Sequence, residues 1–170
     1  DSAKSYLAKT SPAETVEERI HYYFLVGNYT QVVALARTHS AKTEGYETWY
    51  RIGQAYEFLG VADTALSYYQ RVVKAEPLRH SYRIKYANLL MQTSQMDRAK
   101  AEFQFVLKEQ PWQLDALNGM GLWCLVNFEI DQAETYLNRA LGYDPTYEPA
   151  MINLAKVYIG RNEKKKAKEQ

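Results

Sequence analysis

The fold of this chain is decided by residues 49–77, which read WYRIGQAYEFLGVADTALSYYQRVVKAEP. In this stretch apolar or small residues recur at helical intervals, first on one segment and then on a second. They are Trp49, Ile52, Gly53 and Tyr56 in the first segment and Ala65, Tyr69, Val72 and Val73 in the second. Gly60 can take a positive φ and end the first helix, Asp63 can accept hydrogen bonds from the N–H groups that open the second, and Pro77 stops it. The stretch therefore predicts two consecutive helices.

The residues that start and stop these helices recur every 34 residues, so the pair of helices is a repeated unit. Four columns share this spacing: Pro77, Pro111 and Pro145; Asp63, Asp97 and Asp131; Ala65, Ala99, Ala133 and Ala167; and Tyr69, Phe103 and Leu137. A small residue followed four positions later by a bulky one suits the close approach of two helices. Upstream, Ser11 to Glu14 read as a capping box, and Val16, Ile20 and Phe24 continue it as an apolar stripe. No strand-like alternation interrupts the pattern, so we expect an all-α chain.

The residues Trp49-x2-Ile52-Gly53-x2-Tyr56, Ala65-x3-Tyr69 and Pro77 resemble the tetratricopeptide repeat family. The resemblance implies a right-handed superhelical α-solenoid of antiparallel helix pairs. It places a flank at 1–11, a degenerate repeat at 12–45, three good repeats at 46–79, 80–113 and 114–147, and a truncated repeat at 148–170. That last repeat is expected to end its first helix, reach only Ala167 of its second, and continue beyond Gln170.

In tetratricopeptide proteins, as the resemblance implies, the first helix of each pair lines a concave groove that receives a peptide or helix of a partner. The corresponding face here mixes apolar side chains and amides where a merely solvated face would be mostly charged. The candidate groove residues are Tyr50, Gln54, Glu57, Ile84, Asn88, Met91, Asn118, Leu122, Leu125, Ile152 and Lys156. We expect apolar anchors to sit around Tyr50, Ile84 and Leu122 while Asn88 and Asn118 hydrogen-bond the ligand backbone. The alternative is that several of these residues pack against a neighbouring helix instead.

These features predict a non-catalytic protein-binding scaffold with no cofactor and no metal. The single cysteine, Cys124, occupies a packing column, and the three histidines have no ligand or catalytic partners at helical spacing. A net charge of +1 argues against nucleic acid, and no apolar run is long enough for direct membrane insertion. A clamp for a terminal carboxylate needs cations, but the column Tyr50, Ile84, Asn118 and Ile152 carries none.

Two other roles stay open. The first helix of the truncated repeat at 148–170 is apolar and has no capping helix after it. The chain could therefore be a homotypic assembly module that forms a homodimer through its C-terminal repeat. It could also be the regulatory or targeting domain of a larger multidomain protein. The lone cysteine favours a reducing compartment such as the cytoplasm, and the periplasm remains an alternative if a leader has been removed.

Overall fold

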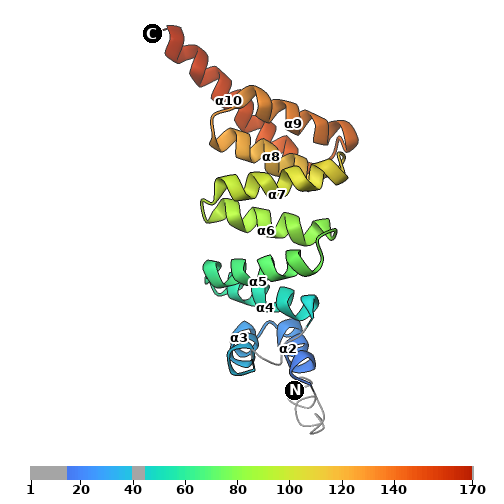
Figure 1. Cartoon of the computed structure of the whole chain (residues 1–170). Helices are drawn as coiled ribbons and strands as arrows, with labels where there is room; N and C mark the ends of the chain where they lie inside the picture. The colour runs from blue at the N-terminus through green and yellow to red at the C-terminus, as the bar shows by residue number, and fades with distance from the viewer. Residues whose placement is uncertain (1–14, 40–44, 170) are drawn as a thin grey trace. The chain divides into compact units, whose positions relative to one another are not determined.

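The structure is a computed structural model that describes the backbone of residues 15–39 and 45–169 and the side chains of residues 15–39 and 45–162. All regular secondary structure in these ranges is helical, which confirms the all-α prediction. The helices are α2 (Val16–Leu25), α3 (Tyr29–Thr38), α4 (Tyr46–Phe58), α5 (Ala62–Ala75), α6 (His80–Gln92), α7 (Met96–Glu109), α8 (Leu114–Val126), α9 (Ile130–Tyr143) and α10 (Glu148–Glu169) (Figure 1). None of the described helices has both the length and the apolarity required to cross a membrane.

The chain forms two compact units, Asp1–Tyr82 and Arg83–Gln170, and the boundary falls inside α6. In the first unit, α2 packs on α3 and α4 packs on α5, each as a helical hairpin. Helix α2 begins at a capping box in which the Thr15 hydroxyl accepts from the Glu18 amide and the Glu18 carboxylate accepts from the Thr15 amide. The capping box predicted at Ser11 to Glu14 lies outside the described residues.

The close approach expected between paired helices is present in the α4–α5 and α8–α9 hairpins. A Cβ built on Gly53 of α4 would lie 2.7 Å from Cε1 of Tyr69 on α5, so only glycine lets the buried tyrosine ring reach this depth. In the second unit, a Cβ on Gly121 of α8 would lie 2.6 Å from Cδ2 of Leu137 on α9. Ala65, Ala99 and Ala133 of the small column are all fully buried.

The turns inside the hairpins repeat one backbone conformation. Gly27, Gly60, Ser94 and Phe128 occupy equivalent positions, and all four have a φ between 60° and 76°. After each of them, the next amide donates back to the carbonyl of the residue five positions earlier; the Glu129 amide, for example, lies 2.8 Å from the Cys124 oxygen. This is the Schellman end of a helix, and it caps carbonyls that would otherwise be unpaired.

The aspartate column does not cap helices as the sequence suggested. Val61, Gln95 and Glu129 are the N-cap residues of α5, α7 and α9, and none of them makes a side-chain cap hydrogen bond. Each aspartate lies two residues after the N-cap residue, in the first helical turn, where its charge suits the positive end of the helix dipole. The proline column acts as predicted, because α5, α7 and α9 each end two residues before their proline.

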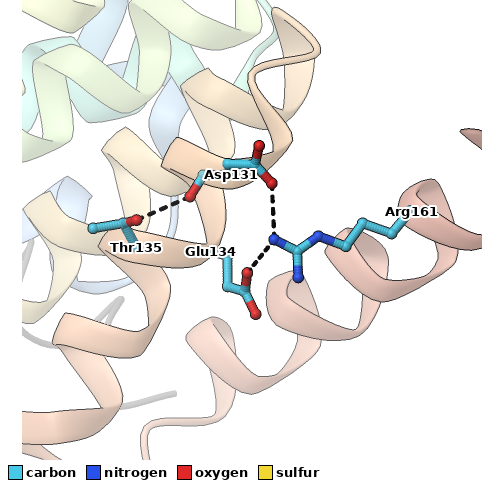
Figure 2. Close-up of polar contacts among 4 residues, drawn as sticks. All are labelled: Asp131, Glu134, Thr135 and Arg161. Atoms are coloured by element: carbon cyan, nitrogen blue, oxygen red, sulfur yellow. Dashed lines mark hydrogen bonds and ion pairs between the residues drawn. The ribbon is translucent and has the colours of Figure 1, made fainter.

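The C-terminal repeat does not contain the two helices that the sequence predicted, a complete first helix and the beginning of a second. Residues Glu148–Glu169 form one continuous helix, α10, which passes through Asn162, the position equivalent to the left-handed turns of the earlier repeats. Lysine, alanine and glutamate dominate this stretch, and their high helix propensity favours continuation. Arg161 secures α10 to the first turns of α9, with Nη2 2.8 Å from Asp131 Oδ1 and 2.5 Å from Glu134 Oε2 (Figure 2).

Candidate functional site

The candidate residues of the first unit belong to a cluster of tyrosines on the first-helix side of the α4–α5 hairpin. The ring of Tyr50 lies 4.5 Å from that of Tyr82 and 5.6 Å from that of Tyr69, measured between centroids. Glu57 accepts a 2.5 Å hydrogen bond from the Tyr69 hydroxyl. Burial raises the pKa of Tyr50, and the neighbouring Tyr82 and Glu57 raise it further. Tyr50, Glu57 and Gln54 are all half-buried, so only part of each side chain is available to a ligand.

In the second unit, the candidates on α6 have three different environments. Ile84 is only 5% exposed, so the predicted role of this residue as a surface anchor is wrong, because a ligand cannot reach its side chain. Asn88 is exposed, as a hydrogen-bonding residue of a binding surface must be. Met91 is half-buried and packs against the hydrophobic core of the unit, and Leu125 on α8 does the same. The packing alternative therefore applies to Met91 and Leu125.

The remaining candidates meet between α8 and α10, which lie against each other in the second unit. Asn153 Nδ2 donates to Asn118 Oδ1 at 2.8 Å, and Lys156 Nζ donates to Asn153 Oδ1, also at 2.8 Å. Asn153 is buried, and both polar atoms of its amide are used in these bonds. The network fixes the orientation of Asn118, because its oxygen must face Asn153 and its NH2 group must therefore point elsewhere.

Apolar side chains lie next to this network. Leu122 follows Asn118 by one helical turn on α8 and is half-buried, whereas Ile152 on α10 is 58% exposed. We call Asn118, Leu122, Ile152, Asn153 and Lys156 the α8–α10 surface. Such a surface offers fixed amide and ammonium donors beside an aliphatic patch, which are the contacts that a peptide main chain and its apolar side chains need.

Negative charge next to this surface is already engaged. Asp115 is the only charged residue of α8, and its Oδ1 accepts a 2.6 Å hydrogen bond from the Tyr147 hydroxyl. Burial raises the pKa of Tyr147, and the hydrogen bond to the Asp115 carboxylate raises it further. This bond ties the start of α8 to the residue that precedes α10, and thereby supports the geometry of the α8–α10 surface.

Three residues of these clusters are not among the candidate groove residues. The sequence suggests Tyr82 and Tyr147 only as exposed tyrosines that could extend the binding surface, and it does not single out Asn153. A signal for them exists in the repeat period. Contacts between adjacent repeats recur at separations of 32 to 35 residues, as in Tyr50 with Tyr82, Asp115 with Tyr147 and Asn118 with Asn153. A search for polar or aromatic pairs near this separation would have found all three.

Cys124 is fully buried, and burial and the nearby Glu129 raise the pKa of its thiol to about 11, so it is protonated at neutral pH. Among the described residues, no three histidine, cysteine, aspartate or glutamate side chains gather closely enough to hold a metal ion.

Comparison with known proteins identifies repeats of a known kind in two segments of the chain. Models described as tetratricopeptide repeat match residues 46–77 and 127–170. These matches identify tetratricopeptide repeats in two segments of the chain, and the repeated hairpins and the solved structures that share the fold agree with them. No curated protein matches it by sequence.

Several solved structures share the fold. A tetratricopeptide repeat protein from Parabacteroides merdae has a TM-score of 0.76 at 18% identity over 87% of this chain, which spans 59% of that protein's length. YrrB, a TPR protein with an unusual peptide-binding site, has a TM-score of 0.71 at 21% identity, with 78% of this chain and 69% of YrrB covered. The first TPR of Spaghetti (RPAP3), bound to an HSP90 peptide, has a TM-score of 0.63 at 16% identity, with 69% and 93% covered. At these identities the likeness concerns the fold alone.

Proposed function

We propose that this chain is a protein-interaction scaffold and that the α8–α10 surface binds an extended peptide or a short helix of a partner protein. The observation that carries the proposal is the hydrogen-bonded chain Asn118–Asn153–Lys156, which holds polar donors in fixed positions next to Leu122 and Ile152. Preorganised donors reduce the entropy that is lost when a flexible ligand binds. The fold supports the proposal, since repeat arrays present extended surfaces for binding.

Two structural neighbours add support at the level of function class. YrrB has a peptide-binding site and the RPAP3 repeat domain holds a peptide. In this chain, Asn118 provides amide hydrogens for main-chain carbonyls of the ligand, and Lys156 keeps two further N–H donors beyond the one given to Asn153. Leu122 and Ile152 contact an aliphatic side chain of the ligand. Asn88 adds a hydrogen-bonding group on α6.

A displayed library of random peptides tests this proposal. The chain is used to select binding peptides, and the affinity of one selected peptide is then measured by fluorescence anisotropy for the wild type, Asn118→Ala and Leu122→Glu. We expect each substitution to weaken binding by about tenfold or more, as expected when a central contact of an interface is lost.

Matched controls separate a lost contact from a damaged fold. Asn138→Ala removes an exposed amide from α9, and Val126→Glu introduces a carboxylate at the partly exposed end of α8. Both controls should bind the peptide as the wild type does, and all variants should keep the helical circular dichroism spectrum. If Leu122→Glu binds every selected peptide with unchanged affinity, the proposed surface is wrong.

A further inference from the structure

Helix α10 has one face that packs and one that does not. Ala150 and Val157 are fully buried in the core of the second unit, and Leu154 packs against that core. Arg161 continues this inward stripe through its ion pairs with α9 (Figure 2). The opposite face is apolar and open: Met151 is 50%, Ile152 58%, Tyr158 52% and Ile159 61% exposed, and Ala155 at its centre is also exposed. The spacing of these five residues places them on one side of the helix.

The preceding repeat shows what such a face normally contacts. The residues 34 positions before Met151, Ala155 and Tyr158 are Leu117, Gly121 and Cys124 of α8, and all three are buried. Helix α9 covers them, with Leu137 directly above Gly121. The part of the open face formed by Met151, Ala155 and Tyr158 is thus the repeat equivalent of an established helix–helix interface.

We propose that this face is covered by α10 of a second copy of the chain, in an antiparallel, two-fold symmetric pair centred on Ala155. In such a pair, Met151 faces Ile159 of the other copy and Ile152 faces its Tyr158, because each pair of numbers is symmetric about 155. Alanine at the centre allows the two helices to approach closely, and bulky side chains fill the space on both sides. The face is therefore complementary to itself.

Charge favours the same arrangement. The segment that leads into α10 is acidic, with Asp144 and Glu148, whereas the sequence after Arg161 has a net charge of +2, with Lys164, Lys165, Lys166 and Lys168 against Glu163 and Glu169. An antiparallel pair brings the acidic start of one helix toward the basic end of the other, and a parallel pair would bring like charges together. The proposed pairing face shares Ile152 with the α8–α10 surface, but Met151, Ala155, Tyr158 and Ile159 are not part of that surface, so the inference can be tested without it.

Sedimentation velocity of the full chain tests the inference over concentrations from about 1 to about 200 μM, a range that covers micromolar self-association. We expect the wild type to shift from monomer to dimer as concentration rises. The double variant Met151→Glu, Tyr158→Glu should remain monomeric at every concentration, and Leu25→Glu, which places a carboxylate at another exposed apolar side chain, should dimerise as the wild type does. A wild type that stays monomeric at the highest concentration overturns the inference, as does a double variant that dimerises normally.

A cross-link tests the symmetry and keeps the inference falsifiable if the double variant unfolds. Ala155→Cys brings two thiols together at the proposed axis, so mild oxidation should yield a covalent dimer. Thr135→Cys, at an exposed position of α9, should yield little dimer under the same conditions. Equal yields from the two variants would contradict the antiparallel pair.

Discussion

Phe128 takes a backbone conformation that glycine adopts at equivalent turns, and this gives a sharp prediction about stability. Its φ is 60° and its side chain is 76% exposed. A residue with a Cβ therefore occupies the left-handed region, and burial of its side chain compensates little for the unfavourable backbone conformation. Gly27 and Gly60 occupy equivalent positions. A non-glycine residue costs about 1–2 kcal/mol in this region.

The expected effect follows from two opposing contributions. Phe128→Gly removes the left-handed cost of about 1–2 kcal/mol, but the unfolded chain gains flexibility worth about 0.5–1 kcal/mol. The glycine variant should therefore be more stable than Phe128→Ala by about 0.5–1 kcal/mol, since alanine keeps the Cβ and also lacks the ring. Comparing glycine with alanine cancels the small loss of ring contacts.

Urea unfolding followed by far-ultraviolet circular dichroism measures the difference. The matched control is Asn138, which is exposed on the right-handed helix α9, where glycine should be less stable than alanine by about 1 kcal/mol. The sign of the glycine-minus-alanine difference is thus predicted to reverse between the two positions. Equal signs at both positions would refute the left-handed explanation.

Two further predictions concern packing and ionisation. Gly53→Ala should lower the free energy of unfolding, measured in urea, by about 1–3 kcal/mol, because the added Cβ would collide with Tyr69. Gly142→Ala should not destabilise the chain, because a Cβ at this position meets nothing within 4 Å. Equal effects of the two substitutions would contradict the close-packing argument. Cys124 should resist iodoacetamide at pH 8 until the chain is unfolded, because its thiol is buried and its pKa is raised to about 11. The thiol of Cys124 ionises near pH 9 in the unfolded chain but not in the folded one, so the free energy of unfolding should fall as pH rises from 9 toward 11. Cys124→Ala should remove this fall.

The sequence predicts the repeated architecture well because the period is carried by residues with specific backbone or packing needs. The prolines end helices and the alanine column is buried as expected. The turn at Phe128 is harder to recognise, because its residue type gives no sign of a positive φ and only the spacing from Gly60 does. The continuation of α10 is also difficult to predict from the sequence. Two separate helices would require the first to end near Asn162, and this residue does not end it.

The candidate surface could be predicted only in part. Helical spacing identifies which residues share a face, but it does not show how far a neighbouring helix covers that face. It therefore predicts an exposed anchor at Ile84, which the structure buries. The role of Asn153 depends on two side chains, one of them on another helix, and periodicity along a single helix contains no such information. Spacing between repeats, rather than within one helix, is the signal that connects Asn118 with Asn153.

The most direct test of the proposed binding surface is a map of backbone amide shifts by NMR during titration with a peptide selected on the chain. The account predicts that the largest shifts cluster on α8 and α10, around Asn118, Leu122 and Ile152, and that α7 and α9 change little. Shifts concentrated on α7 and α9, with α8 and α10 unperturbed, would contradict it.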